Sequence, residues 1–233
     1  MRDTRIQKAL ADMGLCSRRQ AEQIILEGRV KLNGHPVKLG DKMDMHEDVL
    51  SVDGRTIRPP KKKEYKYYML HKPRGYITTS SDDRGRKTVM ELIKDIPERV
   101  YPVGRLDKDS EGLLLFTNDG ALANALTHPS HQVAKMYRVT VHPAATEEQV
   151  VALANGVVLD DGTKTLPAII RVVAEDEDRT VMEMSIKEGK NRQIRRMCRA
   201  VGLDVARLSR KSVGAVKLGM LAPGKYRELK PSE

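Results

Sequence analysis

The chain has 233 residues, with 42 Lys and Arg against 32 Asp and Glu and a formal net charge of +10 at pH 7. No run approaches the ~18 apolar residues of a membrane span, and the start, MRDTRIQKALADMG, lacks the apolar stretch of a secretory signal. We therefore expect a cytoplasmic protein, without a membrane partner, that is attracted to a polyanion.

The small numbers of cysteine and aromatic residues narrow the kinds of site and of RNA recognition that the chain can have. Cys16 and Cys198 have no second Cys or His at metal-ligand spacing, so we expect free thiols and no metal site. There is no Trp, one Phe and seven Tyr. A protein that stacks successive single-stranded bases on aromatic side chains needs more. This composition favours recognition of folded RNA, or of duplex shape, by basic groups.

Residues 1–60 read as a small unit of two helices followed by short strands. Apolar residues recur at helical spacing before a stop at Gly14. Ser17 and Gln20 then fit a capping box that opens a second helix, which ends near Gly28. Two turn dipeptides that predict hairpins follow, Asn33-Gly34 and Asp53-Gly54.

Basic residues mark two places in this part of the chain. Arg18 and Arg19 open the second helix, where cations oppose the helix dipole, so RNA phosphate is the natural compensating partner. Pro59 and Pro60 begin a short, stiff linker whose RNA-binding candidates are Lys61, Lys62 and Lys63. We place the domain boundary there, with residues 1–60 before the 61–64 linker and residues 65–233 after it.

Residues 65–233 read as an α+β domain with much strand. Expected strands lie at 67–70, 113–117, 168–174 and 180–187. Capping residues predict helices opening at Thr88, Asp119 and Thr146.

The basic residues are concentrated near the C-terminus. From Lys187 to Lys230 there are 13 Lys and Arg against 3 Asp and Glu, a surplus equal to that of the whole chain. A predicted helix from Asn191 to Val201 buries its apolar face and exposes four arginines. Of these, Arg192, Arg196 and Arg199 are the RNA-binding candidates, although spacing alone does not distinguish Arg195 from them.

The segment 103–120 is the densest in chemistry. Gly104-Arg105-Leu106-Asp107 precedes an apolar strand, so the loop can present the carboxylate at the strand's edge with Leu106 anchored in the core. From the residues alone, one aspartate beside Arg105 and Lys108 is as well explained by an ordinary exposed loop.

This segment, GRLDKDSEGLLLFTND, resembles the signature of the pseudouridine synthases that act on ribosomal RNA. Lys135-Met136-Tyr137 and residues 188–197, EGKNRQIRRM, resemble two further motifs of that family. Residues 1–50 are similar to the S4 RNA-binding domain. The resemblance implies a small N-terminal S4 domain and a catalytic domain with a mixed or antiparallel sheet. Residues 81–89 are most similar to enzymes of large-subunit rRNA, and His71 stands where the family more often has Asn.

The resemblance also implies roles for single residues. Isomerising uridine means breaking the N-glycosidic bond, rotating the base and rejoining it through carbon, with no metal or cofactor. Asp107 would attack the ribose C1′ or assist deprotonation at the sugar. Arg195 would pair with Asp107 and keep it ionised, and Tyr137 would lie against the reacting base. Arg105 would fill the space left by the extruded base.

The expected partner is therefore structured ribosomal RNA, namely 23S rRNA, bound by a monomer. The alternative is a non-catalytic RNA-binding or ribosome-assembly factor with an S4 domain, which leaves the Asp107 segment unexplained. An S4-linked methyltransferase would need a Gly-rich strand-to-helix turn, and an aminoacyl-tRNA synthetase a nucleotide-binding motif; neither is found.

Overall fold

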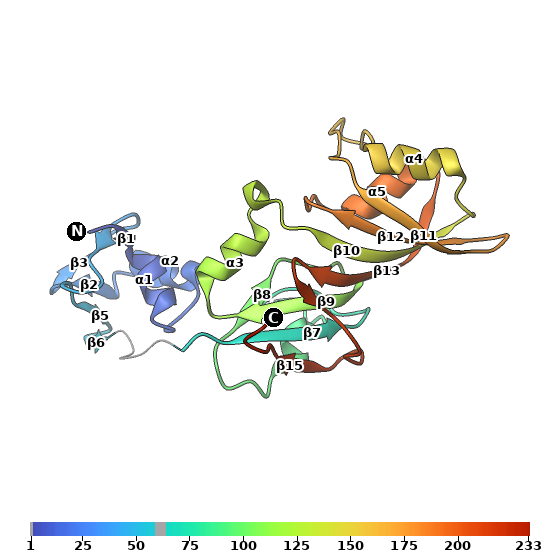
Figure 1. Ribbon diagram of the computed structural model, residues 1–233. Coiled ribbons are helices and arrows are strands. Elements are labelled where there is room, and N and C mark those ends of the chain that lie inside the picture. Colours follow the sequence, from blue (N-terminus) through green and yellow to red (C-terminus); the bar gives the residue numbers. More distant parts are fainter. Residues whose placement is uncertain (1, 59–63) are drawn as a thin grey trace. The chain divides into compact units, whose positions relative to one another are not determined.

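The structure of the chain, a computed structural model, describes residues 2–58 and 64–233. It divides into two compact units, Met1–Glu64 and Tyr65–Glu233, and each has its own hydrophobic core (Figure 1). Lys61, Lys62 and Lys63 of the predicted linker lie outside the described residues. Within the described residues, no helix is long and apolar enough to cross a bilayer.

The first unit packs two helices with short antiparallel strands around a core that includes Ile6, Leu10 and Ile25. Its elements are β1 (Thr4–Arg5), α1 (Ile6–Asp12), α2 (Arg18–Leu26), β2 (Val30–Leu32), β3 (His35–Pro36), β4 (Lys42–Met43), β5 (Leu50–Val52) and β6 (Arg55–Ile57). The strands form a β1-β4 pair and a sheet in the order β3-β2-β5-β6.

The local signals of this unit are confirmed. The Ser17 hydroxyl accepts from the Gln20 amide at 3.2 Å, and the Gln20 side chain accepts from the Ser17 amide at 2.9 Å. The turn residues Asn33 and Asp53 have φ values of 50° and 51°, and each is followed by a glycine with positive φ. Those left-handed pairs close the β2–β3 and β5–β6 hairpins.

The second unit is built on one mixed sheet with helices beside it. Its strands are β7 (Tyr67–Lys72), β8 (Tyr101–Val103), β9 (Glu111–Thr117), β10 (Lys135–His142), β11 (Ile169–Glu175), β12 (Thr180–Ile186), β13 (Asp204–Val213), β14 (Val216–Lys217) and β15 (Tyr226–Glu228). Its helices are α3 (Gly120–Thr127), α4 (Glu147–Asn155), α5 (Gln193–Ala200) and the 3₁₀ turns η1 (Val89–Ile93) and η2 (Pro129–His131).

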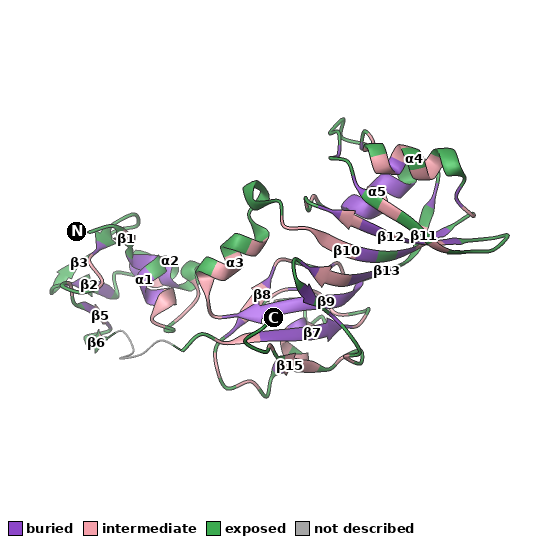
Figure 2. Ribbon diagram, in the orientation of Figure 1, coloured by how far each residue is buried: buried purple, intermediate pink, exposed green. Residues whose placement is uncertain are grey.

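The strand order is β11-β12-β10-β13-β9-β7-β15, with β14 paired to β13 and β8 paired to β9. All of these pairs are antiparallel except β13–β9. The predicted α+β class with a mixed, largely antiparallel sheet is therefore confirmed. Every residue of β9 is buried, which places this strand at the centre of the unit (Figure 2). The long strands β10 and β13 have no counterpart among the predicted elements.

Gly112 allows the one parallel contact of the sheet. It pairs with Arg210 of β13 and has a φ of 110°. A Cβ at this position would collide with the backbone of Arg210. A residue with a side chain would therefore push β13 away from the start of β9, directly after the Asp107 loop.

Candidate active site

The Asp107 loop joins β8 to β9, and contacts with the hydrophobic core hold it in place. Leu106 is buried in the main hydrophobic cluster, as predicted. The buried Thr78 hydroxyl donates to the Leu106 carbonyl at 2.7 Å and accepts from the Leu106 amide at 3.2 Å. The Ser110 amide donates to the Asp107 carbonyl at 3.1 Å, which closes a tight turn. The Asp107 side chain itself is 32% exposed, so it is held in place and still accessible.

Lys72, at the end of β7, lies beneath the same loop and is fully buried. Its ammonium group donates to the carbonyls of Ser110 at 2.7 Å, Asp107 at 2.9 Å and Pro73 at 3.2 Å. Burial lowers the pKa of Lys72 to about 8, although the nearby carboxylates of the loop oppose this shift. Sequence reasoning missed this role, because a lysine that ends a strand is usually solvated.

Replacing Lys72 with Met is expected to lower the free energy of unfolding by about 2–4 kcal/mol at pH 7, because buried carbonyls lose their donor. The folded-state pKa of about 8 lies below the ordinary 10.5. Between those values the unfolded chain binds more protons, so this group adds stability as pH rises. The stability difference between wild type and variant should therefore widen from about pH 8 to pH 10 in urea unfolding followed by circular dichroism.

The exposed Lys108 of the same loop supplies the matched control. Lys108→Met should change the stability by no more than about 0.5 kcal/mol. Equal effects of the two substitutions would show that the buried contacts of Lys72 do not hold the loop.

Two arginines at the start of α5 reach this loop. Arg192 binds the Asp109 carboxylate through two hydrogen bonds of 3.0 and 2.9 Å, and its Nη1 lies 3.6 Å from Oδ2 of Asp107. These contacts hold the pKa of Asp109 below its usual range. Arg192 adopts a left-handed φ of 46° at the N-cap of α5.

Arg195 is set deeper, with only 10% of its side chain exposed. It donates to the carbonyls of Asp109 and Val205, both at 3.0 Å. Its Nε lies 3.3 Å from Oδ2 of Asp109 without the alignment of a hydrogen bond. Arg195 therefore joins α5 to both the start of β13 and the Asp107 loop.

The predicted direct pair between Arg195 and Asp107 is thus corrected. Among the described residues, the ion pair of Arg195 is with Asp109, while Arg192 is the arginine within 4 Å of Asp107. The hydrogen bonds of Arg195 give a physical reason, because the carbonyls of Val205 and Asp109 take its two Nη groups and hold its guanidinium beside Asp109. Sequence spacing alone cannot tell which of two aspartates two residues apart faces the helix.

Two further corrections concern the arginine face of α5. Arg192 and Arg199 are exposed as predicted, but most of the Arg195 and Arg196 side chains is buried. Arg196 is paired with Asp160 and Asp161, the latter at 2.7 Å, and is 17% exposed. These contacts tie α5 to the 157–164 turn and leave less of Arg196 for RNA.

Tyr137 lies in β10 and is 8% exposed, within the main hydrophobic cluster. It pairs with Arg210 of β13, and Arg210 pairs in turn with Gly112 of β9. Two strand spacings therefore separate Tyr137 from the start of β9, or about 10 Å. Among residues 2–58 and 64–233, no hydrogen bond or ion pair joins Tyr137 to Asp107. His71 lies inside β7, and its Nδ1 is 2.7 Å from the Leu221 carbonyl.

Asp107 opens onto a cavity of about 310 Å³. Three basic side chains line it, those of Arg86, Arg105 and Lys108. The remaining lining residues are Ile77, Thr78, Thr79, Ser81, Asp82 and Leu106. A concave site with one accessible carboxylate among cations can bind a polyanionic substrate and attack an electrophilic carbon of it.

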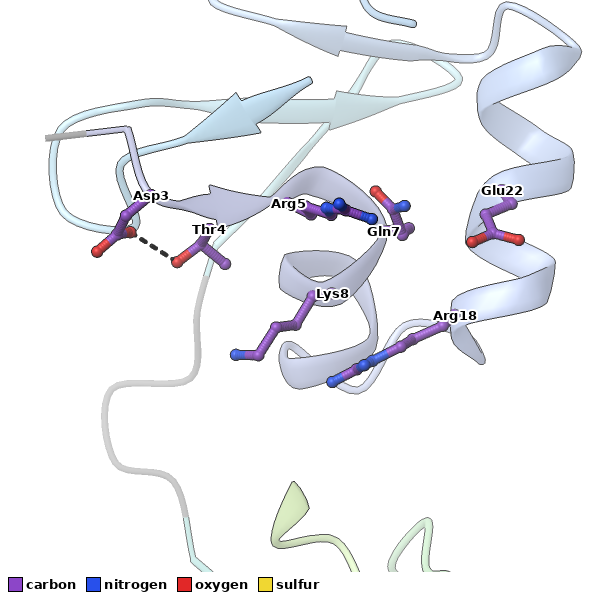
Figure 3. A pocket seen from close by; sticks show the side chains of 7 residues that line it. All are labelled: Asp3, Thr4, Arg5, Gln7, Lys8, Arg18 and Glu22. Carbon is purple, nitrogen blue, oxygen red and sulfur yellow. Dashed lines mark hydrogen bonds between the residues drawn. The ribbon is translucent and has the colours of Figure 1, made fainter. Parts of the chain in front are cut away.

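The first unit has a separate hollow of about 410 Å³, between α1 and α2 (Figure 3). Arg5, Lys8 and Arg18 line it, together with the carboxylates of Asp3 and Glu22. Arg19 is exposed on α2 beside Arg18. Arg18 and Arg19 are thus accessible at the start of α2, as the predicted contact with RNA phosphate requires.

Comparisons with known proteins agree for both units. A family profile described as RNA pseudouridylate synthase matches residues 66–200, and one described as S4 domain matches residues 4–49. The chain is 44% identical over 235 residues to an RNA pseudouridine synthase of Aquifex aeolicus (strain VF5), covering 100% of this chain and 93% of that protein.

A second relative carries a more specific name. The chain is 42% identical over 232 residues to the ribosomal large subunit pseudouridine synthase B of Bacillus subtilis (strain 168), covering 98% of this chain and 93% of that protein. A crystal structure of a pseudouridylate synthase superposes with a TM-score of 0.70 at 32% identity. That match covers 99% of this chain and 97% of the other.

Proposed function

The chain belongs to the RNA pseudouridylate synthase family, and on that premise we propose that it converts specific uridines of 23S ribosomal RNA to pseudouridine with Asp107 as the nucleophile and without a cofactor. The observation that carries the proposal is the accessible Asp107 carboxylate, held at the wall of a cation-lined cavity. The relative named for the ribosomal large subunit supports the choice of 23S rRNA. The proposed working unit is a cytoplasmic monomer.

The proposed reaction balances within the substrate. The Asp107 carboxylate attacks the ribose C1′, and the bond between C1′ and N1 of uracil breaks with its electron pair on the base. The base rotates, C5 attacks C1′, and the carboxylate leaves. C5 then loses its proton and N1 gains one. Deprotonation at the sugar is the alternative task for the same carboxylate.

The surrounding residues support this chemistry by charge and by position. Arg192 and Arg195 favour the ionised form of Asp109, the carboxylate two residues after Asp107, and lower its pKa. Lys72 and Thr78 restrain the loop backbone, which reduces the reorganisation needed for attack. In the proposal, Arg105 takes the place of the extruded base, and Tyr137 contacts the base.

The test is to map pseudouridine in ribosomal RNA from cells that lack this protein. Loss of pseudouridine at one or a few 23S positions, restored by wild type but not by Asp107→Asn, is the expected result. An unchanged map would contradict the choice of ribosomal RNA and favour another RNA substrate.

Removing residues 1–60 is expected to weaken RNA binding while leaving a folded catalytic unit. The described residues of Tyr65–Glu233 contain their own core clusters and the whole Asp107 cavity. Circular dichroism should show a cooperative melt, and binding to a 23S transcript should weaken. An insoluble or unfolded fragment would show that the proposed domain boundary is wrong.

A further inference from the structure

Residues 75–88 contribute part of the wall of the Asp107 cavity. Hydrogen bonds hold this segment to the Asp107 loop at two points. The Gly75 amide donates to the Lys108 carbonyl at 2.7 Å. Thr78 contacts both backbone groups of Leu106. At the far end of this segment, Ile77 and Thr88 form a β-bridge. The turn between those anchors, residues 79–87, is therefore held at a defined distance from Asp107.

Asp82 organises this turn. Its side chain is only 5% exposed, although the turn lies on the surface. It accepts hydrogen bonds from the backbone amides of Arg84 at 3.2 Å and Arg86 at 2.8 Å. It also accepts from the Arg86 guanidinium, from Nε at 3.0 Å and from Nη2 at 2.5 Å. One carboxylate thus fixes both the backbone of the turn and the direction of one arginine.

Arg86 keeps most of its donors free in this arrangement. A guanidinium has five N–H groups in a planar fork, and Asp82 takes one from Nε and one from Nη2. The side chain is 49% exposed and lines the cavity that contains Asp107. The outer edge of the fork matches two oxygens of a phosphate, and its orientation is already set before RNA binds.

The side chains of the two residues between Asp82 and Arg86 that carry charge, Asp83 and Arg84, are placed differently. Asp83 and Arg84 are exposed, and neither lines the cavity. The turn therefore contains two aspartates and two arginines. Of these, Asp82 and Arg86 line the cavity, and Asp83 and Arg84 do not. The Asp82–Arg86 pair therefore differs from ordinary exposed charged residues, such as Asp83 and Arg84.

We propose that Arg86 binds an RNA backbone phosphate next to the target uridine, and that Asp82 is the positioning residue that aims it; this inference rests on the proposed function. A phosphate cannot lie close to the Asp107 carboxylate without repulsion. Arg86, Arg105 and Lys108, which all line the same cavity, offset that repulsion. The phosphate contact then sets the register of the RNA, so that the ribose of the target reaches Asp107.

The experiment measures pseudouridine formation on a 23S rRNA transcript at several salt concentrations. Arg86→Met should raise KM about tenfold with kcat within about twofold, and lower the slope of log affinity against log salt by about one. Arg84→Met should leave KM and kcat within about twofold. Arg86→Lys should fall between them, because lysine keeps the charge without the fork.

Asp82→Ala is compared with Asp83→Ala, since both remove one negative charge from the same turn and any effect of net charge cancels. Asp82→Ala should raise KM several-fold relative to Asp83→Ala. The double variant of Asp82→Ala and Arg86→Met should be no worse than Arg86→Met alone, because Asp82 acts through Arg86. Circular dichroism melts of all variants show whether the fold is retained.

Three results would overturn the inference: equal KM for Arg86→Met and Arg84→Met, fully additive effects of the Asp82 and Arg86 changes, or a fall in kcat with KM unchanged. Failure of the proposed function looks different. A wild-type protein that forms no pseudouridine on the transcript refutes the function. Fluorescence anisotropy on the same transcript would still compare the RNA affinity of the matched variants.

Discussion

Replacing Asp107 with Asn is expected to abolish turnover while RNA affinity stays within a few fold of wild type. The two side chains have the same shape, so the loop should keep its geometry. The backbone carbonyl that accepts from Lys72 at 2.9 Å is unchanged. An amide cannot attack C1′ as a carboxylate does, and it cannot serve as a general base. The chemical step should therefore be lost without loss of the RNA-binding surface.

Single-turnover assays with 23S transcript separate the two effects, because they report the chemical step when RNA is saturating. Asp83→Asn, an exposed aspartate outside the cavity, is the matched control and should keep wild-type turnover. Substantial turnover by Asp107→Asn would remove this carboxylate from the mechanism and leave Asp109 as the other aspartate of the loop.

Local signals predicted much of the fold. The capping boxes at Ser17 and Thr146 and the turns at Asn33 and Asp53 are all present. These features depend on residues within a few positions of each other, so they can be read from the chain. The buried strand at residues 113–117 was also predictable, because its apolar run is short and continuous.

The strand β13 could not be predicted from its local sequence. Its sequence, DVARLSRKSV, looks solvated, yet Arg210 is 3% exposed and donates to the Leu113 carbonyl at 2.8 Å. Arg207 pairs with Glu111 at 2.7 Å. The partners of these arginines lie nearly one hundred residues away in the sequence. The local sequence around Arg207 and Arg210 therefore cannot predict these contacts.

Distant partners also limit what the number of basic residues near the C-terminus can predict. The surplus between Lys187 and Lys230 predicted a surface for RNA, but several of its members serve the fold. Arg196 binds the 157–164 turn, Arg227 pairs with Glu233 at 2.7 Å, and Arg210 is buried. Net charge predicts attraction to a polyanion, while tertiary partners decide which cations are available to it.

Within α5, Arg195→Met is expected to reduce kcat by about two orders of magnitude or more, while Arg199→Met mainly weakens RNA binding. Arg195 is largely buried and holds the Asp107 loop through one carboxylate and one carbonyl of Asp109. Its removal leaves the Val205 and Asp109 carbonyls without this donor and takes a cation from beside the Asp109 carboxylate. Arg199 is exposed, so its loss should lower the salt slope by about one and leave kcat unchanged.

Arg192→Met decides between two assignments for the cation beside the nucleophile. Arg192 is the arginine that approaches Asp107 within 3.6 Å, although 42% of its side chain is exposed. Solvent screening weakens an exposed pair, so we expect a smaller loss of kcat for Arg192→Met than for Arg195→Met. The opposite ranking would give Arg192 the role predicted for Arg195. Equal effects of Arg195→Met and Arg199→Met on kcat and on RNA affinity would contradict the roles given to these two residues. A buried arginine that holds the Asp107 loop should change kcat, whereas an exposed arginine that binds phosphate should change RNA affinity.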